Sequence, residues 1–323
     1  MRVSELELQD AAAGLLESSS SGALLRQQTD SRGTGASNDI ETSPSAGLFR
    51  QVAGRFVKHR LAVIGLVVTS LLIVIGILAP LLTPHSPYAV TASFSAAPSG
   101  DHWLGTDQVG RDVLSRLIAA SRVSLIVGFS TVGLYITFGT LVGLISAYVG
   151  GWLDMIVMRV TDMFMAFPFL MVILVVVSAL GASLNTIIIV LALFSWPAVA
   201  RLVRSSILSL KQLDYIKAGR ALGYSAPRIW FRHLLPNALG PIIVNATFGI
   251  ASAIMSEAGL SFLGMGVQPP AASWGNMLSD AQSLTVLTDQ PWLWVPAGTM
   301  LLITVLAINF VGDGLRDALD PKR

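Results

Sequence analysis

The chain has 323 residues, of which 53% are hydrophobic and 12% are charged, and its formal net charge is +2. A soluble globular domain carries roughly 25% charged residues, so the composition excludes an ordinary soluble protein and indicates a membrane protein. The lack of cysteine excludes disulfides, thiolate nucleophiles and cysteine-ligated metals. The four histidines are scattered without metal-ligand spacing, and the sequence has no Gly-x-x-x-x-Gly-Lys-Ser/Thr loop. We therefore expect neither a metal site nor an ATP site of that type.

The N-terminal region is expected to be irregular before the first membrane span. Residues 1–47 are rich in Ser, Gly, Ala and Gln without a sustained apolar period, which predicts a disordered cytoplasmic tail. Residues 48–60 alternate apolar and basic side chains. This pattern is typical of an interfacial helix whose basic side chains contact lipid phosphates, although a simple basic flank of the first span explains it equally well.

Six membrane-spanning helices are predicted from apolar runs of about 20 residues. Five runs are nearly free of charge, and a sixth is interrupted only by Glu257. The third and fourth are divided at 181–185, where Gly and Asn favour a turn. The predicted spans are 61–82, 123–149, 163–180, 184–200, 238–262 and 291–312. The chain is divided accordingly into an N-terminal region with the first span and an outer loop (48–122), a transmembrane domain (123–312) and a C-terminus (313–323).

Three local features bear on how the spans pack. Gly139 and Gly143 form a Gly-x-x-x-Gly step, which is suited to close helix contact. Pro168 predicts a kink in the third span. Arg159 and Asp162 are three residues apart on one helix face and could pair across a turn.

The distribution of basic residues predicts the orientation of the spans. With the N-terminus in the cytoplasm, all but three of the 21 Lys and Arg residues fall in the tail, the turn at 150–162, the loop at 201–236 or the C-terminus. The three on the other side are Arg111, Arg116 and Arg122. This asymmetry predicts that both termini are cytoplasmic.

The segment 214–237 is a basic interruption between two apolar runs, and its pattern predicts two short projecting helices. Asp214 is placed as the N-cap of the first helix, and Gly223 stands where the helix end needs a residue tolerant of positive φ. Pro236 is expected to close the unit before the fifth span. The narrow apolar face of the first helix is formed by Tyr215, Ala218, Gly219 and Leu222. An amphipathic loop that lies on lipid headgroups explains the same pattern.

A resemblance to a known family gives this loop a partner. The residues from Lys217 to Gly223, followed by Leu235-Pro236, resemble the EAA loop of binding-protein-dependent ABC transporter permeases. Lys217 stands where that loop has an acidic residue, and a glycine replaces its second alanine. Further segments that resemble the dipeptide, oligopeptide and nickel branch are 103–116, 158–168 and 257–278. In particular, the chain resembles the second permease subunit of dipeptide-type importers, the dipeptide permease C type.

The resemblance implies a fold, a mechanism and a set of partners. The fold is that of a type I ABC importer permease, an all-α membrane protein with six transmembrane helices. The chain would form half of a pore for dipeptides or oligopeptides and work by alternating access, with no catalytic residue, metal or cofactor of its own. Two partner ATPase subunits would bind ATP and Mg and dock on the cytoplasmic loop.

The other implied partners are a sister permease subunit in a heterodimer, an extracytoplasmic substrate-binding protein, and the lipid of a bacterial or archaeal inner membrane, with no nucleic acid. Nickel, glutathione or an oligosaccharide stays open as the solute. A secondary transporter is the alternative mechanism, although the spans hold a single acidic or basic residue and the sequence shows no internal repeat.

Residues outside the loop have more than one interpretation. Glu257, near the outer end of the fifth span, lines or gates the pore mouth, reaches the outer headgroups, or holds the following loop by hydrogen bonds. Asn245 is expected to be a helix-packing group. Residues 113–118 predict a short amphipathic helix against the outer face. Possible contacts of the substrate-binding protein are Arg111, Asp112, Gln268 and Trp274.

Overall fold

The computed structural model describes residues 52–319; the predicted disordered tail at 1–47 and residues 320–323 lie outside this range. Within it the chain is almost entirely helical, with one isolated β-bridge between Thr106 and Asp112. Five helices are long and apolar enough to cross a membrane, and one bent pair of helices passes the same test together. These helices correspond in order to the six predicted spans.

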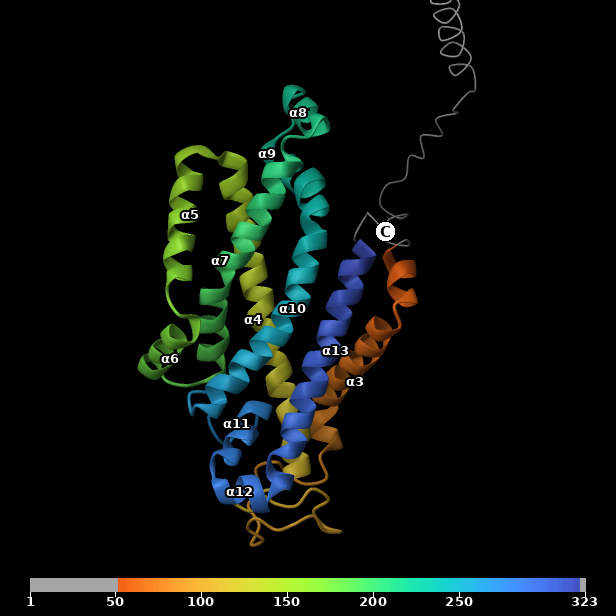
Figure 1. Ribbon diagram of the computed structural model, residues 1–323, viewed down its shortest axis with the longest axis vertical. Helices are drawn as coiled ribbons and strands as arrows, with labels where there is room; N and C mark the ends of the chain where they lie inside the picture. The colour runs from red at the N-terminus through yellow and green to blue at the C-terminus, as the bar shows by residue number, and fades with distance from the viewer. Residues whose placement is uncertain (1–51, 320–323) are drawn as a thin grey trace, which may run out of the picture. The chain divides into compact units, whose positions relative to one another are not determined.

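The long helices run side by side, with α4, α7 and α10 in the middle, α3 and α13 on one flank and α5 on the other (Figure 1). The five single spans are α3 (Arg60–Leu82), α4 (Val113–Val149), α7 (Leu184–Leu210), α10 (Leu235–Phe262) and α13 (Val295–Leu319). Even α3, with 23 residues, is about 35 Å long and exceeds the roughly 30 Å hydrocarbon core of a bilayer. Residues 52–58 are also helical and are separated from α3 by its N-cap, His59.

The third predicted span, 163–180, has the wrong bounds. The structure divides this region into α5 (Gly151–Ala166) and α6 (Phe169–Leu180), which meet at 85°. The break lies at the predicted kink, where Phe167 is extended, with φ −91° and ψ 144°, and Pro168 follows. Proline has no N–H and disfavours a helical conformation of the residue before it, so α5 ends there.

Four other spans are longer than predicted, because hydropathy detects only the apolar part of a helix. The predicted short outer helix at 113–118 forms the first turns of α4, which begins well before residue 123. Helix α7 continues to Leu210, through residues that had been assigned to the cytoplasmic loop. Likewise, α10 begins at Leu235 and α13 ends at Leu319. Charged or polar side chains recur in the added turns at the ends of α4, α7 and α13 and lower their hydropathy.

The predicted Gly-x-x-x-Gly step lies at the contact between α4 and α7. A Cβ on Gly139 would come within 2.8 Å of the Trp196 carbonyl oxygen, and one on Gly143 would collide with the backbone of Ala200. The two backbones therefore approach as closely as glycine allows. The predicted close packing occurs, and its partner is a helix of the same chain.

Ion pairs join α5 to α7 near the α8 end of the bundle. Arg204 binds Asp154 with both Nε and Nη2, each at 2.6 Å from a carboxylate oxygen. Asp162 pairs with Arg201, so the predicted Arg159–Asp162 pairing is wrong. The two charges of that prediction lie on one helix, whereas the observed partners face each other across the α5–α7 contact.

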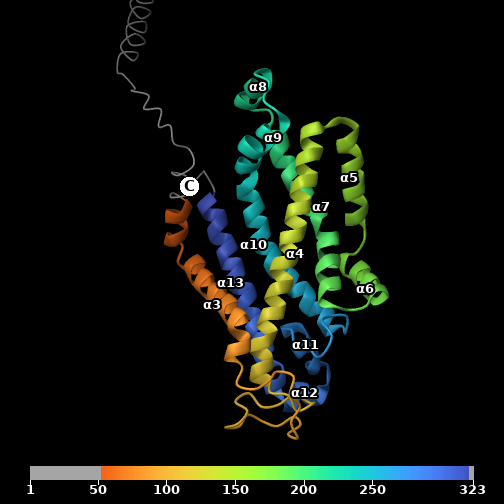
Figure 2. The ribbon, with the colours of Figure 1, turned by 180° about the vertical axis from the view of Figure 1, so that it is seen from behind.

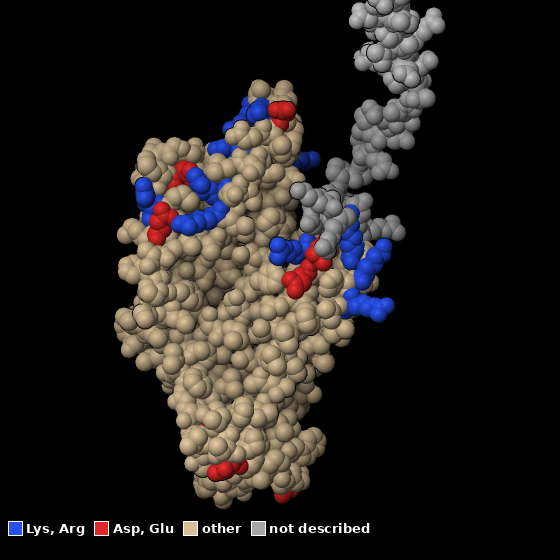
Figure 3. Space-filling view, viewed as in Figure 1, with Lys and Arg blue, Asp and Glu red and all other residues tan. Residues whose placement is uncertain are grey.

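The charged residues are unevenly distributed along the molecule. On the face shown in Figure 3, Lys and Arg gather near α8 and at the neighbouring ends of the other helices, and a broad band without charge follows. The opposite end holds the loop between α3 and α4, together with α11 (Trp274–Leu278) and α12 (Leu284–Asp289) (Figure 2). This pattern agrees with the predicted orientation, in which the α8 end is cytoplasmic.

Candidate functional site: a projecting helical loop between α7 and α10

Helix α8 (Asp214–Ala221) projects beyond the ends of the neighbouring helices, and α9 (Ala226–Ile229) lies beneath it (Figure 1). The predicted pair of short helices is therefore present. The second of them does not end before the fifth span, because α9 passes through a π-helical turn, η1 (Trp230–Leu234), directly into α10. Together they form one continuous helix from Ala226 to Phe262.

Pro236 lies in the first turn of α10 and does not close the loop as predicted. In η1 the N–H of Leu235 donates to the carbonyl of Trp230, five residues earlier. In this widened turn the backbone N–H groups donate to carbonyls five residues earlier instead of four. The turn lies directly before Pro236, which has no N–H to donate. The helix can therefore pass through this proline without ending.

The two ends of α8 differ in how well they were predicted. At the first end the predicted N-cap is wrong by one residue, because the N-cap is Leu213 and not Asp214. Asp214 is the first helical residue, where its carboxylate faces the positive end of the helix dipole. At the other end, Gly223 has φ +76°. Tyr224 N–H donates to the Gly219 carbonyl and Gly223 N–H donates to the Arg220 carbonyl, both at 3.0 Å, which is the hydrogen-bond pattern of a Schellman motif.

The exposed face of α8 differs from the predicted one in a single residue. Gly219 is buried and faces inward, where a Cβ would lie 3.1 Å from the ring of Tyr224. Tyr215, Ala218 and Leu222 are exposed, and Leu222 has 75% of its surface accessible. This exposed face is largely apolar, and its side chains differ in size. An exposed apolar patch of this kind is typical of a surface that packs against a protein partner.

Lys217 is paired only weakly with its neighbour on the same helix. Its Nζ lies 3.4 Å from the Asp214 carboxylate, and both side chains are largely exposed. An exposed pair of this kind contributes roughly 0–1 kcal/mol, so the lysine is available to another molecule.

Aromatic and cationic side chains tie the loop to the bundle. The guanidinium of Arg220 lies 4.6 Å from the ring centre of Tyr148, near the end of α4, and that ring packs edge-on against Trp230. Arg228 lies over Tyr224 at 4.4 Å. Sequence reasoning missed these contacts, since the only signal for them is the interleaving of Arg and aromatic residues.

At the opposite end of α10, Glu257 is fully buried. Its Oε1 accepts hydrogen bonds from the Ser261 hydroxyl at 2.6 Å and the Ser273 hydroxyl at 2.8 Å. Reaching the outer headgroups is therefore excluded, and Glu257 does hold the following loop, because Ser273 is the N-cap of α11. Trp274 is also fully buried, so its prediction as a binding-protein contact is wrong.

The predicted outer-face residues separate into two groups. Asp112 is buried and caps α4, which leaves it unavailable as a contact. Arg111 binds Asp107 at 2.7 Å, and Gln268 is exposed while its amide donates to backbone carbonyls of its own loop.

Nearby, burial raises the pKa of Asp280 to about 6, with Asp107 adding to the effect and two arginines opposing it.

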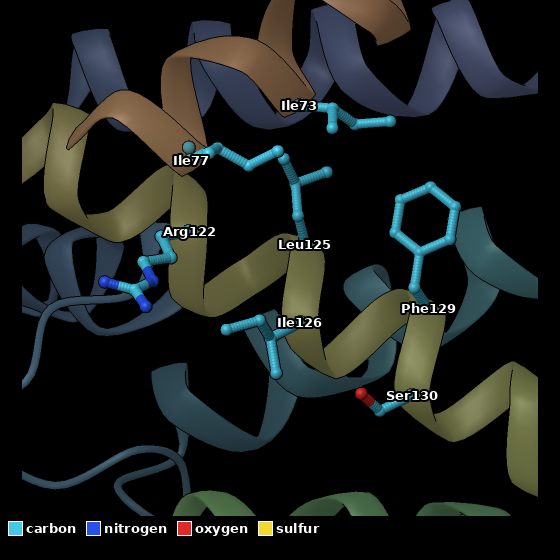
Figure 4. Close-up of a pocket in the computed structure, with 8 residues that line it drawn as sticks. Ile73, Ile77, Arg122, Leu125, Ile126, Phe129 and Ser130 are labelled. Atoms are coloured by element: carbon cyan, nitrogen blue, oxygen red, sulfur yellow. The ribbon is translucent and has the colours of Figure 1, made fainter.

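Two cavities within the bundle differ in their lining. One of about 410 Å³ lies between α4, α5, α7 and α10 and combines aromatic rings with polar groups, including Tyr135, Ser195 and Asn245. The other cavity, of about 440 Å³, lies between α3 and α4. Its lining side chains are apolar except for Ser130 and Arg122, and the Arg122 side chain points away from the others (Figure 4). The first cavity has the hydrogen-bonding groups that a polar solute needs, and Asn245 belongs to it.

Comparison with known proteins decides the family. The model of the binding-protein-dependent transport system inner membrane component matches residues 139–323, and the model of the N-terminal TM domain of oligopeptide transport permease C matches residues 47–98. The chain belongs to the family of binding-protein-dependent transport system inner membrane components. It is a multi-pass, non-catalytic permease component of an ABC importer, as predicted.

Relatives of this permease match most of its length. A putative peptide permease protein of Brucella suis biovar 1 (strain 1330) is 44% identical, and the match covers 86% of this chain and 92% of that protein. The dipeptide transport system permease protein DppC of Alkalihalophilus pseudofirmus is 43% identical, and the match covers 87% of this chain and 90% of that protein. A solved chain of the MetNI methionine ABC transporter, in an inward facing conformation, is 21% identical, with a TM-score of 0.52 over 64% of this chain and 97% of that chain. At this identity the likeness concerns the fold alone, and it confirms the predicted type I ABC importer permease fold.

Proposed function

We propose that this permease forms half of the translocation pore of an ATP-driven importer of dipeptides or oligopeptides, and that α8 is the surface on which an ATPase subunit docks. The projecting apolar face of Tyr215, Ala218 and Leu222, on a helix fixed to the bundle by its other side, carries the proposal. A loop lying on lipid headgroups would need no such anchoring. Lys217, exposed beside this face, would meet an acidic or polar group of the partner.

The contacts of the loop support a route for motion from the ATPase to the pore. Movement of α8 would reach α4 through the Arg220–Tyr148 contact. It would reach α10 through the turn at Gly223 and then along a single helix, because α9, η1 and α10 are continuous. Both α4 and α10 line the cavity that contains Tyr135 and Asn245. ATP binding in the partner subunits would thus shift the pore between inward-open and outward-open states by rigid-body movement.

The proposed partners follow from the family and from the accessible residues at the outer end of the molecule. ABC importers of this family work with ATPase subunits and a substrate-binding protein, and here two ATPases would bind ATP and Mg. A sister permease would supply the second half of the pore. Arg111 is partly buried and Gln268 is exposed, and both remain proposed contacts of the binding protein.

The proposed solute is a peptide, because the relatives that match over most of the chain are named as peptide and dipeptide permeases. A cavity that offers hydroxyl and amide groups without a charged side chain fits solutes of varied sequence. Nickel, glutathione and oligosaccharides are the competing solutes.

The docking proposal is tested with Leu222→Glu and a matched control. Leu284, in α12 at the opposite end, has 74% of its surface accessible against 75% for Leu222, so Leu284→Glu adds the same charge at the same exposure. With the ATPase and sister subunits co-expressed, Leu222→Glu should reduce co-purification of the ATPase at least tenfold, and Leu284→Glu should not. Equal recovery of the ATPase with both variants would refute docking on α8.

The solute is tested with the same complex in proteoliposomes. ATP-dependent uptake of a labelled dipeptide and a labelled oligopeptide is compared with that of nickel, glutathione and an oligosaccharide, in the presence of the binding protein. Uptake of peptide alone supports the proposal, and uptake of another solute without peptide uptake contradicts it.

A further inference from the structure

Two histidines and a buried carboxylate meet at the outer end of the molecule. The ligand atoms of His85, His102 and Asp112 all lie within 4.8 Å of one another. His102 Nδ1 is 2.8 Å from Asp112 Oδ1, and His85 Nδ1 is 4.0 Å from the same oxygen. His85 lies near the start of the loop between α3 and α4, His102 lies further along it, and Asp112 caps α4 at its end.

We propose that these three residues bind a divalent transition-metal ion of the Zn²⁺ class. Two imidazole nitrogens and a carboxylate oxygen are a donor set that zinc and related ions prefer. Ligand atoms at about 2.0–2.1 Å from one tetrahedral ion lie roughly 3.3 Å apart. The observed separations of 2.8 and 4.0 Å from Asp112 bracket that value, and the two histidine nitrogens lie no more than 4.8 Å apart, so side-chain rotations can bring the three atoms onto one ion.

The surroundings hold the carboxylate in place for this role. Asp112 Oδ2 accepts hydrogen bonds from the Ser115 amide at 2.8 Å and the Ser115 hydroxyl at 2.7 Å, which leaves Oδ1 directed at the histidines. The same hydroxyl accepts a hydrogen bond from the His85 amide at 3.1 Å and so fixes the backbone of the second ligand. Support of this kind around the ligands is typical of metal sites in proteins.

Burial and charge also fit a bound cation. The accessible fraction of the side chain is 3% for Asp112, 14% for His102 and 47% for His85, so the cluster is closed on one side and open to solvent on the other. Among the residues that the structure describes, Arg111 and Arg116 pair with Asp107, and Asp112 lies within ion-pair distance of the two histidines alone. The open side leaves room for an ion to enter and for water to complete its coordination.

A simple hydrogen bond between His102 and Asp112 is the competing explanation. It accounts for the 2.8 Å contact, but it gives no role to His85, whose ring centre lies 5.0 Å from that of His102. His85 therefore distinguishes the two explanations. Its side chain is half exposed, and its replacement should leave the fold intact.

A bound ion would link the segment after α3, the outer loop and the start of α4. This role does not depend on the proposed solute or on the docking of an ATPase. Because an ion that binds only the folded state stabilises it, saturating metal should raise the Tm, by about 5 °C at 100-fold excess over the Kd.

The test uses the full chain, purified in detergent without a histidine tag and stripped with EDTA. Zn²⁺ alone is titrated by calorimetry, and Co²⁺ alone is followed by its visible absorption. Wild type should bind one ion per chain, and His85→Ala should weaken binding at least tenfold. His233→Ala removes a histidine from η1, far from the cluster, and leaves the same number of histidines as His85→Ala, so it should bind as wild type does.

Three results would overturn the proposal: no binding of either ion to wild type, equal binding by His85→Ala, or equal loss in His233→Ala. Asp112→Asn should also lose binding, but this residue caps α4 and its variant could unfold. His85→Ala is therefore the deciding variant, and thermal unfolding without metal establishes that it is folded. Its Tm should equal that of wild type in EDTA and should no longer rise with Zn²⁺.

Discussion

Replacement of Glu257 distinguishes a structural from a gating role. In the structure its Oε1 accepts from two buried hydroxyls, those of Ser261 and Ser273. Glu257→Ala removes both bonds and leaves the protons of two buried hydroxyls without this acceptor. Each lost bond costs about 1–2 kcal/mol, so we expect a loss of roughly 3 kcal/mol in the free energy of unfolding. For a chain of this size, that corresponds to a fall in Tm of roughly 4–6 °C.

Glu257→Gln should have a smaller effect. The amide oxygen can still accept from both serines, while the amide nitrogen takes the position of Oε2, which is buried without a hydrogen-bond partner among the described residues. An unsatisfied donor there costs about 1–3 kcal/mol, so this variant should lie between Glu257→Ala and wild type. Combining Glu257→Ala with Ser273→Ala should cost less than the sum of the two single changes, because the two residues share a bond.

The assay pairs thermal unfolding in detergent with transport in proteoliposomes, normalised to folded protein. If Glu257 only holds α11 in place, transport per folded molecule stays near wild type while Tm falls in the expected order. Loss of transport by Glu257→Gln at an unchanged Tm would refute this reasoning and indicate that Glu257 gates the pore.

Two further predictions concern packing and pH. Gly143→Ala should lower the free energy of unfolding by about 1–3 kcal/mol, because the added Cβ collides with the Ala200 backbone. The control is Gly133→Ala, which lies in open space on the same helix and should be neutral or slightly stabilising. Equal Tm values for the two variants would contradict the close α4–α7 contact. Because the folded-state pKa of Asp280 is raised to about 6, the folded chain holds this proton more tightly than the unfolded chain, and stability should fall as pH rises from 4 to 6. Asp280→Asn should remove that part of the decline in Tm, and an unchanged pH profile would show that Asp280 does not cause it.

Features that depend on local sequence were predicted well. Apolar runs gave the number and order of the spans, although the third run missed most of α5; Pro168 located the break between α5 and α6, and Gly223 located the end of α8. These signals act through the backbone or through transfer into lipid, and neither requires knowledge of a distant residue. Helix ends were missed where polar residues continue a helix beyond the apolar stretch, as in α7 up to Leu210.

Features that depend on tertiary contact were not predictable from one sequence. Gly219 looked exposed by its spacing, but it faces the ring of Tyr224, which the turn after α8 brings back onto the helix. Trp274 follows a cap that is held by Glu257, and this contact takes it out of solvent. His85, His102 and Asp112 show no metal-ligand spacing because the fold of the loop between α3 and α4 brings them together from its two ends and its middle.

The π-helical turn η1 sets the rotational phase of α10. The continuous helix has 37 residues and spans about 55 Å, from the loop that carries α8 to Phe262, just beyond Glu257. A π turn holds one residue more than the α-helical turn it replaces, and one residue corresponds to about 100° of rotation around the axis. Without that extra residue between Trp230 and Leu234, α9 would face a different side of the bundle while Asn245 and Glu257 kept their positions. A single inserted residue therefore determines which sides of this rod belong to the loop, to the cavity and to the outer face.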